Sequence, residues 1–297
     1  MKLFKKKEKG FESKRVGVIS DIDYKQKSVK IVYWLIFVFA VLVAFVCIAP
    51  PLWVILSSFK DTKEFYQIPP TLFPKTWDFS KLTNAWKTLD FLKYYKNTFI
   101  ITIGSILSAI IFNGLAGYVL SKLKPKGWTV VFAVIMGSMM IPAQVSMVPT
   151  YINIVNLHML NTYWPMILMA GYNAFLTIVF KSFFDGIPSA LIEAAQIDGC
   201  TRLGVFFRIV LPLSKAVMFT AAILSFNAAW GDFFWPLLVL KDRSVYTIMV
   251  EVYTVQQNIA QDQALIILTF AIIPPAIMFV FFQKYIMQGM TMSGIKG

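Results

Sequence analysis

Cysteine and histidine are scarce in this chain of 297 residues, which contains two cysteines and one histidine. Cys47 falls inside a long apolar run and Cys200 in a polar interval, so we expect no disulfide bond between them. Neither cysteine has further ligands at metal-binding spacing, and His158 stands alone. The sequence therefore indicates neither a disulfide framework nor a metal site, and we expect no cofactor in this chain.

Acidic residues are also rare within the long apolar runs, where Asp232 is the only one. An ionisable group at membrane depth is a functional candidate by default. Asp232 lies near the end of its run, however, and we favour a structural role in which it is hydrated or paired with Lys241 or Arg243. A proton- or sodium-coupled transporter is expected to show more such carboxylates and usually an internal repeat, and we find neither.

Apolar residues dominate what is present, at 58% of the chain with a mean hydropathy of +0.66. This composition lies far outside the soluble range. An apolar segment of roughly 20 residues crosses the hydrocarbon as a helix, and the chain is predicted to be an all-α integral membrane protein with six transmembrane helices. We interpret the first span as an uncleaved anchor, because it is too long for a signal-peptide core. The expected spans are about 31–56, 98–121, 129–152, 163–180, 216–240 and 264–283.

The distribution of basic residues predicts that both termini are cytoplasmic. Six spans place both termini on one side, and that side holds nineteen of the 28 Lys and Arg residues against nine on the other. Such an excess marks the cytoplasmic side. The net charge of +13 is then a topology signal and a contact for anionic headgroups, and we expect no nucleic-acid partner. The expected organisation is a basic arm at 1–30, a transmembrane domain at 31–288 and a cytoplasmic tail at 289–297.

Small and polar residues within the expected spans raise packing and path interpretations. The second span has small residues four positions apart, a spacing that allows close helix contacts in lipid: Gly104 with Ser108, Ser105 with Ala109, and Asn113 with Gly117. Pro142 and Pro149 interrupt the third span, and a kink beside a transport path explains them as well as a simple packing kink does. Four polar or aromatic residues are candidates for a path, although core packing explains each of them better: Gln144, Asn173, Asn227 and Trp230.

A polar interval at 182–215, between two apolar runs, predicts a compact helix-turn-helix. Its first helix has a shallow face made by Leu191, Ala194, Ala195 and Asp198 at i, i+3, i+4 and i+7. Gly199 is placed for a left-handed residue after the helix end, Thr201 for a cap on the second helix, and Pro212 for a stop after Ile209. The small alanines permit close approach of a partner, and Glu193 can meet a cation.

The extended pattern of this interval resembles the coupling loop of permease subunits in ATP-binding-cassette (ABC) importers. The match to maltose-type carbohydrate permeases covers about residues 31–297 and is to the subunit with a C-terminal tail. The chain departs from that pattern at a few positions: His158 stands where Gly is frequent, Gly231 where Asn is frequent, Ala216 where Pro is frequent, and Ala190 and Ile192 where acids are common. The resemblance rests, beside the interval, on segments 57–60, 69–70, 97–98, 141–142, 161–163, 230–237 and 289–297.

This resemblance implies the type I ABC importer permease fold in the cytoplasmic membrane of a bacterium or archaeon. It implies a second permease subunit, an ATPase homodimer that binds ATP and Mg, an extracytoplasmic substrate-binding protein, and a sugar, an oligosaccharide first, as cargo. The chain has no Gly-x-x-x-x-Gly-Lys-[Ser/Thr] loop, so it is no ATPase by that route and we expect no enzyme activity. The implied ATPase-coupling residues are Glu193, Ala194, Ala195, Asp198, Gly199, Ile209, Leu211 and Pro212, and the implied ATPase-contacting tail residues are Gly289, Thr291, Lys296 and Gly297.

Two alternatives stay open at this point. The same machinery can import glycerol phosphate, another polyol or a modified glycan. A more distant alternative is an ion-coupled transporter or channel without an ATPase, and co-purification of a nucleotide-hydrolysing chain separates it from the first two.

Overall fold

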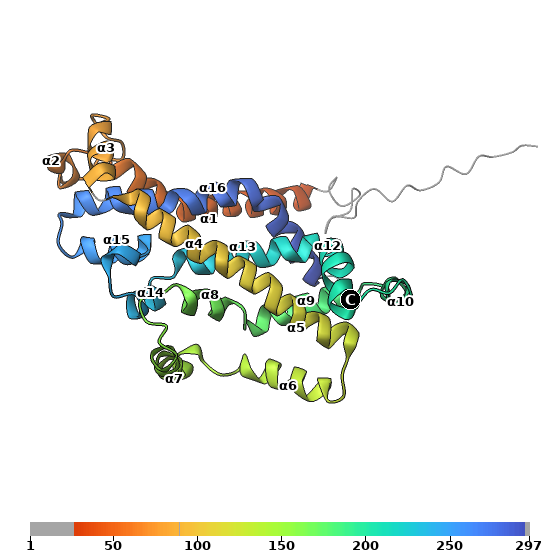
Figure 1. Ribbon diagram of the computed structural model, residues 1–297. Helices are drawn as coiled ribbons and strands as arrows, with labels where there is room; N and C mark the ends of the chain where they lie inside the picture. Colours follow the sequence, from red (N-terminus) through yellow and green to blue (C-terminus); the bar gives the residue numbers. More distant parts are fainter. Residues whose placement is uncertain (1–26, 89, 295–297) are drawn as a thin grey trace, which may run out of the picture. The chain divides into compact units, whose positions relative to one another are not determined.

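The computed structural model describes residues 27–88 and 90–294, with side chains described for 29–87 and 90–283. Every regular element within these ranges is a helix (Figure 1). The chain divides into two compact units, residues 1–53 and 54–297. The described part of the first unit belongs to α1 (Lys27–Ser57), whose segment Val29–Ser57 is long and apolar enough to cross a membrane.

The second unit is built from short and long helices joined by tight turns. Three π-helical turns interrupt two of its helical stretches, where backbone bonding widens to i→i−5. In chain order the elements are α2 (Thr62–Phe65), α3 (Phe79–Thr88), α4 (Phe91–Ser108), η2 (Ala109–Asn113), α5 (Gly114–Tyr118), η3 (Val119–Leu123), α6 (Trp128–Ser138), α7 (Ala143–Asn156), α8 (Trp164–Ala170), α9 (Ala174–Asp185), α10 (Ser189–Ile197), α11 (Arg202–Val205), η4 (Phe206–Val210), α12 (Leu211–Leu213), α13 (Lys215–Gly231), α14 (Phe234–Val239), η5 (Arg243–Val245), α15 (Ile248–Gln256) and α16 (Gln261–Gly294).

In the described part of the chain, four helical stretches can cross a membrane by length and composition. Two further stretches pass the same test only as bent pairs. α6 and α7 are bent by 105° around Pro142, which precedes α7, and the stretch from α11 to α12 is bent by 85° against α13. The structure therefore supports between four and six spans, and the kink predicted in the third span is confirmed.

Three helices do not begin or end at the limits predicted for the spans. The helix of the second span begins at Phe91, before the predicted limit at 98, and its aromatic start is buried in the core. The fifth was expected to run to 240, but α13 ends at Gly231 and α14 starts anew, because Asp232 accepts backbone hydrogen bonds that begin the next helix. α16 runs through Gly294, so the expected tail start at 289 lies inside a helix.

Close helix contacts in the second unit depend on small residues, as predicted. A Cβ added at Gly117 would lie 2.8 Å from Phe180 Cβ and 2.9 Å from the Lys181 backbone nitrogen, so α5 and α9 are nearly in backbone contact. Buried Asn113, the last residue of η2, joins this stretch to α8 and α9, since its Nδ2 donates to the carbonyls of Ala109 and Ala170 and its Oδ1 accepts from Thr177. These bonds satisfy polar groups that the apolar surroundings would otherwise leave unpaired.

We expect Gly117→Ala to destabilise the purified chain by about 1 to 3 kcal/mol, because backbone atoms of α9 cannot move aside as a flexible side chain can. Gly114→Ala on the same helix is the matched control, since its Cβ would come no closer than 3.4 Å, to Phe206 Cζ. Thermal unfolding of the two variants measures the difference. Equal melting temperatures would contradict the close α5–α9 contact.

Candidate functional site

α10 and the turn after it have the local structure that the sequence predicts. Gly199 has a φ of +82°, in the left-handed region that glycine adopts without a Cβ clash. The Cys200 N–H donates to the Ala195 carbonyl and the Gly199 N–H to the Gln196 carbonyl, at 2.9 and 3.0 Å. This pair of bonds is a Schellman motif, which ends a helix firmly. The turn therefore holds α10 at a defined angle to α11.

The second helix begins as predicted but ends differently. The Gly204 N–H donates to Thr201 Oγ1 at 3.1 Å, so Thr201 caps α11. The helical path then continues through η4 into α12 and breaks only at Ser214, so the predicted stop after Ile209 is wrong. Pro212 therefore lies inside the continuous helical path, one residue before its last residue Leu213.

The face predicted for α10 is divided between solvent and core. Leu191, Glu193, Ala194 and Asp198 are exposed, whereas Ala195 is buried. Ile197, at the end of α10, is 87% exposed. α10 and its C-cap Asp198 therefore present an exposed surface that combines two carboxylates, a small alanine and apolar side chains.

The end of the second span holds both ends of α10. We name Tyr118, Ser121 and Lys122 the helix-end clamp. Ser121 Oγ donates to Asp185 Oδ1 at 2.7 Å, and Lys122 Nζ donates to the Ile187 carbonyl at 2.5 Å, just before α10. Tyr118 Oη donates to the Arg202 carbonyl at 3.3 Å, just after the turn.

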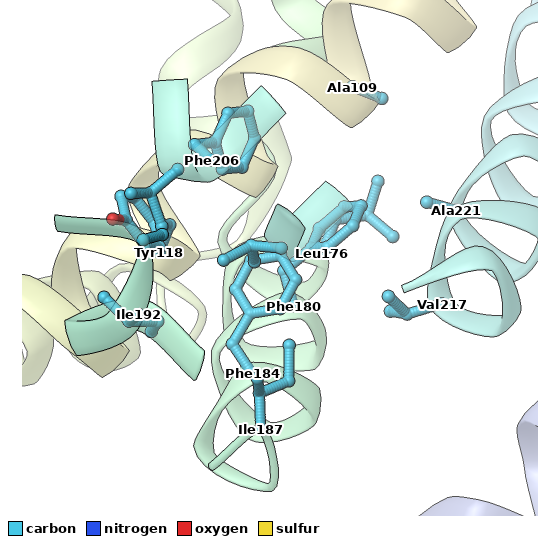
Figure 2. Close-up of a cluster of buried hydrophobic side chains, with 13 residues drawn as sticks. Ala109, Tyr118, Leu176, Phe180, Phe184, Ile187, Ile192, Phe206, Val217 and Ala221 are labelled. Carbon is cyan, nitrogen blue, oxygen red and sulfur yellow. The ribbon is translucent and has the colours of Figure 1, made fainter. Parts of the chain in front are cut away.

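The hydrophobic contacts beneath α10 reinforce this clamp. Figure 2 shows the Tyr118 ring beside Phe206, with Ile192 of α10 directed into the same cluster; the two ring centroids are 5.5 Å apart. Ala195 belongs to the cluster, and Ile209 and Leu211 are half-buried against it. Lys181 adds an ion pair to the other oxygen of Asp185 at 2.8 Å. The 182–215 segment is thus packed and hydrogen-bonded to α5, η3 and α9, while the outer face of α10 stays free.

The clamp was missed from the sequence. Lys122 entered the sequence analysis only through the count of basic residues, and Asp185 was not singled out. One signal was present, because Lys181 and Asp185 are four residues apart and such a pair on a helix can bond. The partners of Ser121 and Tyr118 lie 64 and 84 residues away, and no local pattern indicates such contacts.

Asp232 has the structural role favoured above, but with other partners. Its Oδ1 accepts the backbone N–H of Phe234 at 3.0 Å and of Trp235 at 3.3 Å, which starts α14. The expected partner Arg243 instead binds Glu251, whose side chain is buried, through Nε at 3.2 Å. This bond raises the pKa of Arg243 above its ordinary value.

We expect Asp232→Asn to leave stability and transport nearly unchanged, because an amide oxygen can accept the same two backbone N–H groups. Asp232→Ala removes the acceptor and is expected to cost about 1 kcal/mol. Unfolding and uptake of the two variants, compared with the wild type, measure this. Loss of transport in Asp232→Asn with normal assembly would instead place the carboxylate in the transport path.

Two of the four candidate path residues are committed to the fold. Trp230 is 1% exposed, donates through Nε1 to the Ala271 carbonyl at 3.1 Å and stacks on Phe226. Asn173 caps α9 by accepting the Leu176 N–H at 3.0 Å. Gln144 on α7 and Asn227 on α13 are exposed in this chain. Asn173 is exposed as well, so of the four candidates only Trp230 is withdrawn from a path by burial.

The candidate tail residues are only partly within the described structure. Gly289 and Thr291 lie in α16, and their side chains are not described. Lys296 and Gly297 lie outside the described residues.

The sequence of the chain matches a known protein family and several characterised relatives. The family model described as "Binding-protein-dependent transport system inner membrane component" matches residues 15–292. The arabinooligosaccharides transport system permease protein AraQ of Halalkalibacterium halodurans is 30% identical over 278 residues, covering 92% of this chain and 100% of that protein. The sulfoquinovosyl glycerol transport system permease protein SmoH of Agrobacterium fabrum is 31% identical over 252 residues, covering 84% and 88%.

A solved structure shows the same fold. It is a chain of a bacterial ABC transporter involved in the import of the acidic polysaccharide alginate, with a TM-score of 0.78 at 23% identity, covering 88% of this chain and 98% of that one. The apolar helices and this fold make the protein a multi-pass membrane protein. The chain therefore belongs to the family of binding-protein-dependent transport system inner membrane components, which are permease subunits of ABC importers and not enzymes.

Proposed function

We propose that this chain is a permease subunit of an ATP-driven importer that moves an oligosaccharide into the cell. The cargo class is supported by the relative named for arabinooligosaccharides, which the chain matches over that relative's whole length. The importer includes a second permease, an extracytoplasmic substrate-binding protein and two copies of an ATPase. ATP and Mg are bound by the ATPase, because this chain has no phosphate loop.

The observation that best supports this function is that α10 is exposed on one face, while the segments before and after it are hydrogen-bonded to the second span. We propose that α10 docks on the ATPase through the exposed Glu193, Ala194 and Asp198, with apolar contact from Leu191 and Ile197. A small residue such as Ala194 lets a partner's surface approach closely, and Glu193 meets a basic residue there, as the resemblance implies. Ala195, Gly199, Ile209, Leu211 and Pro212 then shape and support the loop without touching the ATPase.

The clamp gives this docking a mechanical consequence. A displaced α10 pulls on Asp185 and on the Ile187 and Arg202 carbonyls, and these are bonded to Ser121, Lys122 and Tyr118. Closure of the ATPases favours one state of the permease only if contacts through α10 differ between the states. We propose that the clamp passes this difference to the second span. The tail residues Gly289, Thr291, Lys296 and Gly297 remain proposed ATPase contacts.

A second candidate cargo is a modified glycan or polyol. The relative SmoH, named for sulfoquinovosyl glycerol, is 31% identical to this chain, compared with 30% for the arabinooligosaccharide relative, over a shorter match of 252 against 278 residues. A screen of sugars decides between the two cargo classes. Neutral oligosaccharides and anionic glycosides are each added to the reconstituted complex with its binding protein. We expect ATP hydrolysis to rise only with the sugar that is transported. Hydrolysis that no sugar of either class stimulates would contradict the proposal.

We propose six spans, counting each bent pair as one, with both termini in the cytoplasm of a bacterium or archaeon. The organisation is then a basic arm at 1–30, a permease domain at 31–288 with its coupling loop at 182–215, and a tail at 289–297. The basic asymmetry between the two sides supports this orientation.

In a background without Cys47 and Cys200, we expect single cysteines at Ser80 and Ser189 to label from opposite sides of the membrane. Both positions are exposed, so accessibility depends on sidedness alone. A membrane-impermeant maleimide on intact cells should reach Ser80→Cys only. Labelling of both cysteines from outside would reject the orientation.

A further inference from the structure

Two adjacent prolines weaken α16 inside its membrane-spanning segment. Pro274 and Pro275 lie within Gln261–Gln283, the part of α16 that is long and apolar enough to cross a membrane. A proline inside a helix has no N–H to donate to the carbonyl four residues before it. The helix therefore leaves the carbonyls of Phe270 and Ala271 without their usual donors, and it bends more easily here than elsewhere.

Side chains from two other helices supply the missing donors. Tyr95 of α4 donates through Oη to the Phe270 carbonyl at 2.5 Å. Trp230 of α13 donates through Nε1 to the Ala271 carbonyl at 3.1 Å. These are the two carbonyls that the proline pair has deprived of a helical donor. In a bilayer such carbonyls must be satisfied by neighbouring groups, because the hydrocarbon offers no water. The shape of α16 at the proline pair therefore depends on where α4 and α13 stand.

The two donors are also packed against each other. The ring centroids of Tyr95 and Trp230 are 5.9 Å apart, and Phe226 of α13 stacks on Trp230. All three belong to one hydrophobic cluster with the first half of α16, residues 261–273. Close-packed side chains transmit a displacement because they have no free space to absorb it. The first half of α16 is therefore tied to both α4 and α13.

The helices that carry the donors both lead to the coupling loop. α13 begins at Lys215, directly after this loop, and Trp230 is next to its last residue. In Figure 1, α13 extends from α12 towards α14 at the opposite end of the second unit. Tyr95 lies in the second turn of α4, and the stretch Phe91–Leu123 that starts there ends with the helix-end clamp.

We propose that Tyr95 and Trp230 are positioning residues for transport, and that the proline pair is a pivot in α16. Through the two donors, the first half of α16 follows α4 and α13 when the coupling loop moves. The second half turns about the pivot and so changes its distance from α13. The inference rests on the proposed function, because the coupling loop supplies the motion.

A double-mutant cycle tests whether each donor serves its own proline. In the complex that co-purifies with the full-length chain, Tyr95→Phe removes one hydroxyl group and should lower the melting temperature. Pro274→Ala returns an N–H to the Phe270 carbonyl, so Tyr95→Phe should lower the melting temperature less in that background. Tyr95→Phe with Pro275→Ala is the matched control and should be close to additive. An equal loss in both proline backgrounds would overturn the proposal.

Pulsed electron paramagnetic resonance tests the pivot itself. In a chain without native cysteines, spin labels are placed at Leu224 on α13 and at Gln283 in the second half of α16, both of which are exposed. In complexes that hydrolyse ATP, we expect ATP with orthovanadate to shift the distance between these labels. The control pair is Leu224 and Gln261, which is exposed at the start of α16, and its distance should stay unchanged.

Restoring the helix should remove this motion without weakening the fold. The combined Pro274→Ala and Pro275→Ala variant regains both helical bonds, so its melting temperature should not fall, whereas the shift between Leu224 and Gln283 should be lost. If the prolines were only structural, the shift would persist. A shift that persists in this variant, or that is absent from the wild type, would overturn the proposal. The double-mutant cycle needs no nucleotide, so it still tests the two donors if α10 proves not to be the coupling element.

Discussion

Sugar uptake is expected to be lost in Glu193→Lys, by roughly a hundredfold or more, because like charges brought together at a docking surface cost several kcal/mol. Glu193 is exposed on α10, so the substitution should leave the membrane fold and its pairing with the second permease intact. Uptake, surface expression and co-purification of the ATPase are measured together. The isosteric Glu193→Gln is the control and should retain more uptake than Glu193→Lys.

A geometric variant of the same loop separates charge from shape. No atom lies within 4 Å of a Cβ added at Gly199, so only the φ of +82° penalises a side chain there. Gly199→Val should therefore uncouple uptake from hydrolysis, whereas Gly199→Asn should be mild because asparagine tolerates the left-handed region. Wild-type uptake in both Glu193→Lys and Gly199→Val, at equal expression, would show that α10 is not the coupling element.

The second large effect is expected from the clamp. The combined Ser121→Ala and Lys122→Met variant loses both bonds that precede α10, and each bond of this kind contributes about 1 to 3 kcal/mol. We expect uptake to fall about tenfold or more, while the ATPase stays bound and continues to hydrolyse ATP. The ratio of ATP hydrolysed to sugar transported should therefore rise.

The ratio of ATP hydrolysed to sugar transported distinguishes two roles of the clamp. If the clamp only stabilised the fold, its loss would lower hydrolysis and uptake together and leave this ratio unchanged. Lys126→Met is the matched control, since it removes a charge from an exposed position in the same basic loop. If the clamp variant loses hydrolysis and uptake in equal proportion, or if Lys126→Met behaves in the same way, the clamp does not transmit the motion of α10.

The sequence was most informative where local chemistry decides the structure. The left-handed turn at Gly199 and the cap at Thr201 depend on backbone preferences within a few residues, and both predictions are confirmed. Small residues at helix-contact spacing likewise predicted the close approach at Gly117. His158 has a φ of 54°, in the left-handed region that glycine adopts most readily, which fits the glycine that the resemblance places at this position.

The sequence was least informative where a contact joins distant parts of the chain. The partner of Asp262 is Thr62, 200 residues away, and the buried acid Glu251 was overlooked because it stands outside the expected spans. The π-helical turns have no simple sequence signature, and η4 carries the helix past the expected stop at Pro212. Trp230, a candidate for the path, proved to be a core residue because its neighbours come from α4 and α16.

Site-specific photocrosslinking in living cells tests the central claim most directly. A benzophenone amino acid replaces Ile197 at the exposed end of α10, and Ile68 in the segment between α2 and α3, which is 93% exposed, provides the control. The account predicts that the Ile197 position crosslinks to an ATP-binding chain, with a yield that changes when ATP hydrolysis is blocked, and that the Ile68 position does not crosslink to that chain. Absence of an ATP-binding chain from the Ile197 crosslinks, in cells that still import the sugar, would contradict it.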